Sequence, residues 1–135
     1  IVRVQDGKGN VLVQNSKNPN GYTLPGGHIE LGESFVQSAI RDVKEKTGLN
    51  VERLSLCGTK QFITSDNCRH IVFLYKTNVF NGEINEESYW IPLSNIHDYK
   101  LVLKLVSGLS DVLEVFAGTK FNELYYNAQY QLKKY

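Results

Sequence analysis

The alternation of apolar and polar residues along the chain predicts several short strands. Segments rich in Val, Ile, Leu and aromatic residues, bounded by Gly, Pro, Asn, Asp or Ser, are typical of strands in a partly buried sheet. The longer segments of this kind are residues 1–5, 11–14, 54–64 and 70–79. Two shorter extended segments are residues 22–24 and 88–93.

Gly, Asn and other polar residues separate these segments. Residues 6–10 contain two glycines and an asparagine, which tolerate positive φ, so a hairpin joining 1–5 to 11–14 is expected. Residues 16–20 are polar and include a proline, which predicts a loop. A turn is expected at residues 65–67, between the two longest strands.

The clearest helix is predicted over residues 34–47. Ser34 is a good N-cap, and Gln37, three residues later, completes a capping box. Gly48 is placed to end the helix in the left-handed conformation. The apolar face of this helix consists of Val36, Ala39, Ile40 and Val43.

A second helix is predicted over residues 101–116, where large apolar residues recur at helical spacing. The tail, residues 121–135, predicts a hairpin that turns at Asn127 and Ala128. The order of strands, helix, strands, helix and hairpin predicts an α+β fold in which helices pack on a mixed sheet.

The composition is that of an ordinary globular protein and excludes several functional classes. The 135 residues suit one domain spanning 1–135, and 41% of them are hydrophobic and 21% charged. The net charge is +1, whereas proteins that hold a nucleic acid backbone usually carry a strong basic excess, so no nucleic acid polymer is expected as partner. No apolar segment approaches the roughly 20 residues that cross a bilayer, so no membrane association is expected.

The cysteines and the start of the chain add further expectations. Cys57 and Cys68 form no C-x-x-C pair and are expected to be reduced thiols, with a disulfide across a hairpin as the alternative. Reduced thiols and the lack of a signal peptide favour the cytoplasm. The chain contains no Met and opens on strand-like sequence, which predicts that the native N-terminus precedes Ile1.

Residues 27–49 combine a glycine-rich loop with a helix that carries acidic residues on its polar face. Asp42 and Glu45 are three residues apart, so both carboxylates point to one side of the helix. Glu33, just before the helix, is expected to approach Arg41. Mg²⁺ prefers carboxylate oxygens, neutralises the charge of a pyrophosphate and activates water for its hydrolysis. A glycine loop also lets main-chain carbonyls approach such an ion.

This segment resembles the Nudix box, written G-x5-E-x7-R-E-U-x-E-E-x-G-U, in which U is an aliphatic residue. The matching positions are Gly27, Glu33, Arg41, Val43, Glu45, Gly48 and Leu49. The preceding Leu24-Pro25-Gly26, the strand with Trp90 and the C-terminal helix are also similar to this family. The resemblance implies a Nudix fold, an α/β/α sandwich with a mixed sheet between helices.

Two positions depart from the box. Asp42 replaces its first helical Glu and keeps the negative charge. Lys46 replaces the last Glu, which is usually a principal metal ligand in the family. A protonated lysine has no acceptor and repels a metal cation. One hypothesis is therefore that Lys46 contacts substrate phosphate in place of one of several ions.

In detail the chain resembles small bacterial MutT-like enzymes. The resemblance implies hydrolysis of a nucleoside diphosphate derivative, with a (d)NTP such as 8-oxo-dGTP as the expected substrate and the monophosphate and pyrophosphate as products. It also implies Mg²⁺ or Mn²⁺ as cofactor.

The resemblance also implies the residues of the site. The expected catalytic residues are Glu33, Arg41, Asp42 and Glu45. The expected metal ligands are the main-chain carbonyl of Gly26, Asp42, Glu45 and Glu83, with Glu86 and Glu87 as alternatives to Glu83. The residues expected to bind the substrate are Gly27 and Lys46.

Two other functional interpretations stay open. The charge reversal at Lys46 favours a Nudix-fold module that binds a nucleotide, as a sensor, without catalysis. A purely structural α+β domain would make the match to the box a coincidence. Dimers are common in the family, and the C-terminal tyrosines suit either a homodimer interface or packing on the sheet.

Overall fold

The structure is a computed structural model that describes residues 1–17, 20–99, 101 and 109–135. The strands are β1 (Val2–Val4), β2 (Asn10–Lys17), β3 (Asn20–Thr23), β4 (Asn50–Glu52), β5 (Ser55–Ile63), β6 (Arg69–Thr77), β7 (Val79–Asn81), β8 (Ser88–Pro92), β9 (Glu123–Tyr126) and β10 (Leu132–Lys134). The helices are α1 (Phe35–Thr47), the 3-10 helix η1 (Leu93–Asp98) and α2 (Leu109–Ala117). None of these helices is long and apolar enough to cross a membrane.

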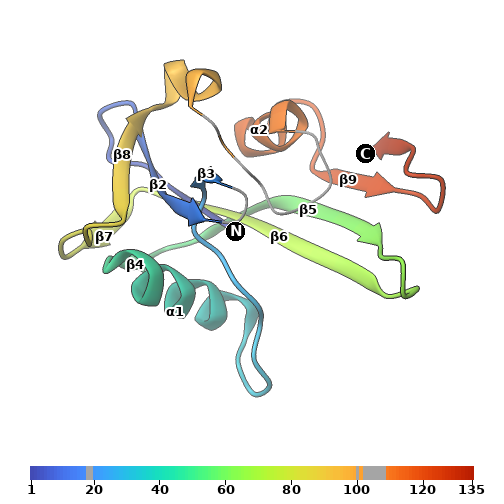
Figure 1. The fold of residues 1–135 in the computed structure, drawn as a ribbon, viewed down its shortest axis with the longest axis horizontal. Helices are drawn as coiled ribbons and strands as arrows, with labels where there is room; N and C mark the ends of the chain where they lie inside the picture. Colours follow the sequence, from blue (N-terminus) through green and yellow to red (C-terminus); the bar gives the residue numbers. More distant parts are fainter. Residues whose placement is uncertain (18–19, 100, 102–108) are drawn as a thin grey trace.

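The largest sheet in the described residues has five strands and is mixed. Its strand order is β1-β6-β5-β9-β10. β1 runs parallel to β6 and β9 runs parallel to β5, whereas the pairs β5-β6 and β9-β10 are antiparallel. A three-stranded antiparallel sheet, β3-β2-β8, and the antiparallel pair β4-β7 complete the architecture (Figure 1).

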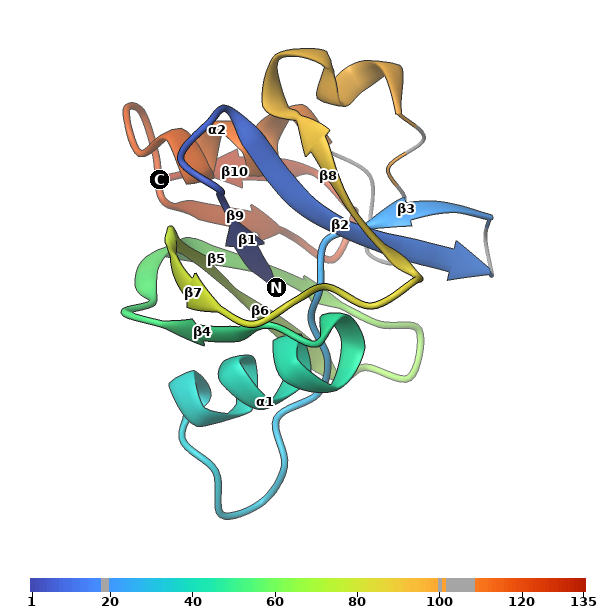
Figure 2. The ribbon, with the colours of Figure 1, turned by 90° about the vertical axis from the view of Figure 1, so that its left-hand side faces the viewer.

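The helices α1 and α2 lie on opposite sides of the five-stranded sheet, as Figure 1 and Figure 2 both show. The alternation of side chains along β6 explains this layering, because neighbouring residues of a strand point to opposite faces. Leu74 belongs to the core on the α2 side, and Tyr75 belongs to the core on the α1 side. The predicted α+β class, with a mixed sheet between helices, is confirmed.

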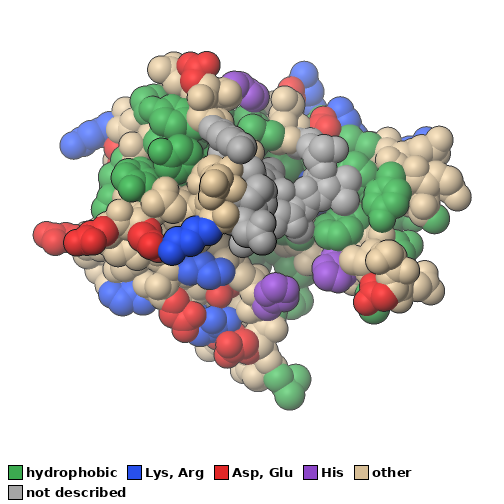
Figure 3. Space-filling view, in the orientation of Figure 1, with side chains coloured by type: hydrophobic (Ala, Val, Ile, Leu, Met, Phe, Trp, Pro, Cys, Tyr) green, Lys and Arg blue, Asp and Glu red, His purple; other side chains and the backbone are tan. Residues whose placement is uncertain are grey.

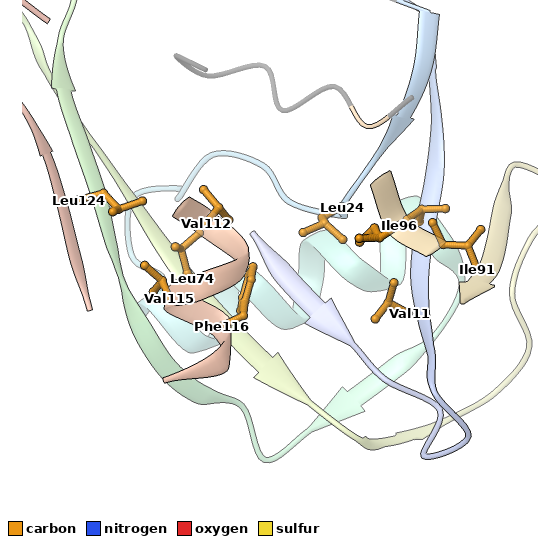
Figure 4. Close-up of a cluster of buried hydrophobic side chains, with 10 residues drawn as sticks. Val11, Leu24, Leu74, Ile91, Ile96, Val112, Val115, Phe116 and Leu124 are labelled. Atoms are coloured by element: carbon orange, nitrogen blue, oxygen red, sulfur yellow. The ribbon is translucent and has the colours of Figure 1, made fainter. Parts of the chain in front are cut away.

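Each side of the sheet has its own hydrophobic core. In the α2-side core, Leu74 of β6 and Leu124 of β9 lie next to Val112, Val115 and Phe116 of α2 (Figure 4). The buried members of the α1-side core are Val2, Val4, Leu12, Ala39, Val43, Leu49, Val51 and Tyr75. The α1 helix is therefore fixed to the sheet by apolar contacts along one face, which leaves its other face for polar residues.

The predicted caps hold α1 at both ends. The Ser34 hydroxyl accepts a hydrogen bond from the Gln37 backbone N–H, and the Gln37 side chain accepts one from the Ser34 N–H, so the capping box is confirmed. Gly48 ends the helix at a φ of +89° and donates its N–H to the carbonyl of Lys44. A Cβ at Gly48 would lie 2.8 Å from the carbonyl oxygen of Glu83, so this position needs glycine for space as well as for conformation.

Some local predictions were wrong in their boundaries or pairing. The expected hairpin between residues 1–5 and 11–14 is reduced to a single bridge between Gln5 and Val11, because β1 pairs with β6 and β2 enters another sheet. The predicted loop at 16–20 was wrong at its ends, since β2 continues to Lys17 and β3 begins at Asn20, and its middle, residues 18–19, lies outside the described residues. Apolar periodicity does not distinguish local pairing from pairing with a distant strand.

The C-terminal predictions are partly confirmed. The hairpin over residues 121–135 is present as β9 and β10, with a turn that begins at Asn127. The second helix ends at Ala117, one residue after the predicted end, and Leu101, its expected first residue, forms a bridge with Tyr22. The part of that prediction over 102–108 lies outside the described residues. The strands β4 and β7 and the helix η1 were not predicted because each is too short for a clear period.

Both cysteines are free, so the prediction of reduced thiols is confirmed and the hairpin disulfide was wrong. The thiol of Cys68 is exposed, whereas that of Cys57 is partly buried. Burial raises the pKa of the Cys57 thiol above its ordinary value, which keeps it protonated and unreactive at neutral pH.

Two leucines on adjacent strands test the position of the α2-side core. Leu74 is fully buried, and Leu74→Ala is expected to lower the free energy of unfolding by about 2–5 kcal/mol because it leaves a cavity. Leu56 on β5 is 56% exposed, so Leu56→Ala should change it by no more than about 0.5 kcal/mol. Urea unfolding of both variants gives the comparison, and equal losses would contradict the assignment of this core.

Candidate functional site

The guanidinium of Arg41 on α1 is the centre of the polar helix face. Its Nε and Nη2 donate to the two carboxylate oxygens of Glu33, at 2.8 and 2.9 Å. This is the bidentate geometry that gives arginine–carboxylate pairs their strength and direction. The Glu33 side chain is only 21% exposed, so water competes little for the pair.

The same guanidinium also ties the loop before α1 to the helix itself. Its Nη1 donates to Asp42 Oδ1 and to Glu45 Oε2, both at 3.2 Å, and Nη2 donates to the carbonyl of His28 at 3.1 Å. The Ser38 hydroxyl donates to the same His28 carbonyl. The structure therefore brings the four expected catalytic residues together, with the carboxylates of Glu33, Asp42 and Glu45 around the guanidinium of Arg41.

These contacts shift the proton affinity of the pair. The hydrogen bonds from Arg41 hold the pKa of the Glu33 carboxyl below its ordinary value of 4.5. The hydrogen bonds to Glu33, with the nearby charge of Asp42, raise the pKa of Arg41. Both groups therefore stay charged at neutral pH, and the negative charge of Glu33 is neutralised internally.

Asp42 lies in a tight position between α1 and the glycine loop. It is buried, and a Cβ added to Gly27 would lie 2.6 Å from its Oδ1. Only glycine at position 27 lets the loop backbone come this close to the carboxylate. The match of Gly27 to the box thus has a steric reason in this structure.

Lys46 lies one turn beyond Asp42 on the same helix. Its ammonium donates a hydrogen bond to the main-chain carbonyl of Gly26. The carbonyl that was expected to bind a metal ion therefore accepts a hydrogen bond from the Lys46 ammonium instead. The predicted metal role of Gly26 stays a prediction, and it requires this contact to open.

The acidic loop between β7 and β8 lies at the C-terminal end of α1. The carbonyl of Glu83 adjoins Gly48, and the side chain and N–H of Asn85 donate to the carbonyls of Lys46 and Thr47. The side chains of Glu83, Glu86 and Glu87 are exposed, and no contact in the described residues joins them to Asp42 or Glu45. The structure brings this loop to the helix through its backbone.

The donor set fits a divalent ion in part. Asp42 and Glu45 are oriented toward a common point by Arg41, and carboxylates of this kind suit Mg²⁺. In the described part of the chain, however, Asp, Glu, His and Cys side chains form no group of three or more that could hold a metal ion. The observed arrangement therefore offers two carboxylates in place of the larger predicted ligand set.

A pocket of about 660 Å³ connects this polar face to the sheet. Its polar lining includes Gly26, Gly27, Asp42 and Lys46. Its apolar lining includes Ile29, Phe35, Phe62, Ile71 and Phe73.

Phe35 of α1 stacks on Phe73 of β6 with ring centroids 4.3 Å apart, and Phe62 of β5 stacks on His70 of β6 at 5.4 Å. In Figure 3, acidic and basic side chains are interspersed over α1.

Sequence reasoning missed several pocket residues. Phe35 and Phe73 were not singled out, and no role at a site was predicted for His70. Gln14 also lines the pocket, and its buried amide oxygen has no hydrogen-bond partner in the part of the chain that the structure describes. A polar residue on β2 that points to the same side as buried Leu12 was the available signal for Gln14. Trp90 packs against the α1-side core beside Phe80.

Comparisons with known proteins all point to one family. The NUDIX domain model matches residues 1–113. An ADP-ribose pyrophosphatase of Methanocaldococcus jannaschii is 27% identical over 106 residues, covering 70% of this chain and 63% of that protein. The NAD-capped RNA hydrolase NudC of Haemophilus influenzae is 34% identical over 103 residues, covering 73% of this chain and 36% of that protein. The chain thus spans less than two thirds of the length of these curated relatives.

Solved structures agree on the fold. The MutT mutator protein of Bacillus halodurans superimposes with a TM-score of 0.72 at 19% identity, covering 97% of this chain and 90% of that one. At this level of identity the similarity concerns the arrangement of helices and strands.

A double-mutant cycle tests the contact between Gly27 and Asp42. Gly27→Ala is expected to lower the free energy of unfolding by about 1–3 kcal/mol, because the new Cβ collides with the Asp42 carboxylate. In an Asp42→Ala background the collision is absent, and the same change should be neutral or stabilising by up to about 1 kcal/mol. Chemical denaturation of the four proteins measures the coupling. An equal cost in both backgrounds would contradict the proposed contact.

A pH series tests the pair between Glu33 and Arg41. Because the pKa of Glu33 is lowered in the fold, its ionised form stabilises the protein above the ordinary pKa, and this stabilisation is lost as pH falls through the lowered value. Glu33→Gln should therefore be less stable than wild type at pH 7, with the difference closing on acidification. Glu30→Gln is the control, since Glu30 lies 3.8 Å from Arg41 and is 68% exposed. A pH-independent difference for Glu33→Gln would contradict the assignment.

Proposed function

The chain belongs to the Nudix family, and from this premise we propose that it hydrolyses the diphosphate linkage of a nucleoside diphosphate derivative. The substrate we favour is a (d)NTP such as 8-oxo-dGTP, which would give the monophosphate and pyrophosphate. The observation that carries the proposal is the pocket, which joins the polar face of α1 to aromatic side chains of α1, β5 and β6. A nucleotide has a similar division into a charged polyphosphate and a flat base that stacks through its faces.

Each part of the polar face has a separate task in this proposal. Asp42 and Glu45 would hold a divalent ion, Mg²⁺ or Mn²⁺, which when bound neutralises phosphate charge and activates water. Arg41 keeps both carboxylates oriented, and Glu33 fixes the guanidinium by its bidentate contact. Glu83, the expected additional ligand, would have to approach from the loop that contacts the end of α1.

The aromatic part of the pocket suits a base. Phe35 and Phe73 already stack on each other, and Phe62 stacks on His70, so flat surfaces line the apolar side of the pocket. Aromatic side chains stack on every base with little sequence preference. The amide oxygen of Gln14, which lacks a partner among the described residues, would accept a hydrogen bond from an N–H or O–H group of the substrate and so favour substrates that carry such a group.

The names of the relatives support a pyrophosphate bond as the target and differ in the rest of the substrate. One relative acts on ADP-ribose and another on NAD-capped RNA. The substrate of this chain therefore has to be found with a panel. A cytoplasmic location and a homodimer stay predictions.

A second candidate function is nucleotide binding without hydrolysis. The contact between Lys46 and the Gly26 carbonyl favours it, because a fixed cation there opposes metal binding. Metal dependence separates the two functions, since hydrolysis requires the divalent ion and simple binding does not.

Hydrolysis is tested by phosphate or pyrophosphate release from a panel of nucleotides with Mg²⁺ and with Mn²⁺. The panel contains dGTP, 8-oxo-dGTP, other triphosphates, ADP-ribose and a sugar nucleotide. We expect metal-dependent turnover by the wild type, and a loss on the order of a hundredfold or more in Asp42→Asn and in Glu45→Gln, because each removes a negative charge that would hold the ion.

The matched control is Glu52→Gln, which removes one carboxylate from β4 outside the pocket lining and should keep wild-type turnover. Metal-independent binding of a panel nucleotide without turnover would overturn hydrolysis and leave the binding function in its place.

A further inference from the structure

Lys46 has an unusual environment for a surface lysine. It extends from the last turn of α1 into the pocket lining, where its ammonium contacts the carbonyl of Gly26. Of the described side chains that line the pocket, it is the only lysine or arginine. Lys46 is therefore the source of permanent side-chain positive charge on this part of the pocket surface.

The ammonium of Lys46 retains bonding capacity. A lysine has three N–H donors, and the contact with Gly26 uses one of them. Among the described residues, the ammonium makes no other hydrogen bond. Arg41 differs in this respect, because its nitrogens already donate to Glu33, Asp42, Glu45 and the His28 carbonyl.

A main-chain carbonyl that faces a pocket beside a carboxylate is a natural ligand of a hard cation. In this structure the Gly26 carbonyl already has a cation, supplied by the chain itself. A divalent ion and the ammonium would repel each other at this short range, so they exclude one another. The position beside the Gly26 carbonyl is therefore unfavourable for a metal ion, although the carboxylates of Asp42 and Glu45 still suit one.

We infer that Lys46 is a built-in cation that replaces one divalent ion and binds a phosphate oxygen of the substrate directly. The inference rests on the proposed function for its ligand class, a polyphosphate. The free N–H groups of Lys46 would donate to non-bridging phosphate oxygens, while the Gly26 carbonyl keeps the ammonium in place. Polyphosphate binding then becomes partly independent of metal, and the chain binds fewer metal ions than it would with a carboxylate at position 46.

Calorimetric titration with inorganic tripolyphosphate in the presence of EDTA tests direct binding. The wild type should bind, and Lys46→Gln, which keeps an N–H donor for Gly26 but lacks the charge, should bind roughly tenfold to a hundredfold more weakly. Lys44→Gln is the matched control. Lys44 lies on the same helix outside the pocket lining, and its loss changes the net charge equally.

The control variant should bind like the wild type. No binding by the wild type in EDTA would overturn the inference. Equal affinities for all three proteins, or equal losses in both variants, would also overturn it.

The number of bound ions gives a second, independent readout. Electron paramagnetic resonance of Mn²⁺ titrations should find one more ion per chain in Lys46→Glu than in the wild type, because the new carboxylate meets the free Gly26 carbonyl. Lys44→Glu should show no gain. An unchanged count in a folded Lys46→Glu protein would overturn the replacement of an ion. Should that variant fail to fold, the Lys46→Gln titration decides alone.

The inference and the proposed function fail in different ways. Lys46-dependent binding of tripolyphosphate without turnover of any panel nucleotide would overturn hydrolysis and keep the role of Lys46. Turnover together with Lys46-independent binding would overturn the role of Lys46 and keep hydrolysis.

Discussion

The contacts of one guanidinium group hold the candidate site together. Arg41 links a carboxylate before α1, two carboxylates on α1 and the carbonyl of His28. Without this cation, the carboxylates of Glu33, Asp42 and Glu45 would repel one another, because like charges repel at this range. The position of the glycine loop, the orientation of Asp42 and the shape of the pocket next to them all depend on it.

The sheet supplies the rigid surface on which this arrangement is built. Because β6 alternates between the two cores, one strand anchors α2 through Leu74 and faces the α1 side through Phe73 and Tyr75. Phe73 also stacks on Phe35 of α1, so the strand that fixes the helix provides part of the pocket wall. The same residues of β6 thus contribute to fold stability and to pocket shape, so a substitution that changes one is expected to change the other.

The local sequence predicted those parts of the molecule that depend on near neighbours. The capping box at Ser34, the end of α1 at Gly48 and the approach of Glu33 to Arg41 follow from residues less than ten positions apart. The parallel pairing of β1 with β6 joins residues more than seventy positions apart and leaves no periodic signal. The same limit applies to the pocket, since the stacking of Phe35 on Phe73 and the buried amide of Gln14 arise only when distant segments of the chain meet.

The loop between β7 and β8 takes the place of a further helical turn. Asn85 donates to the carbonyls of Lys46 and Thr47, which would otherwise lack partners at the end of α1. The backbone of Lys46 is consequently bound to this loop while its side chain reaches the pocket. Insertions or deletions in the loop would therefore act on the pocket through the backbone of α1, so variation in the length of this connection offers evolution a route to retune the pocket without altering a residue that lines it.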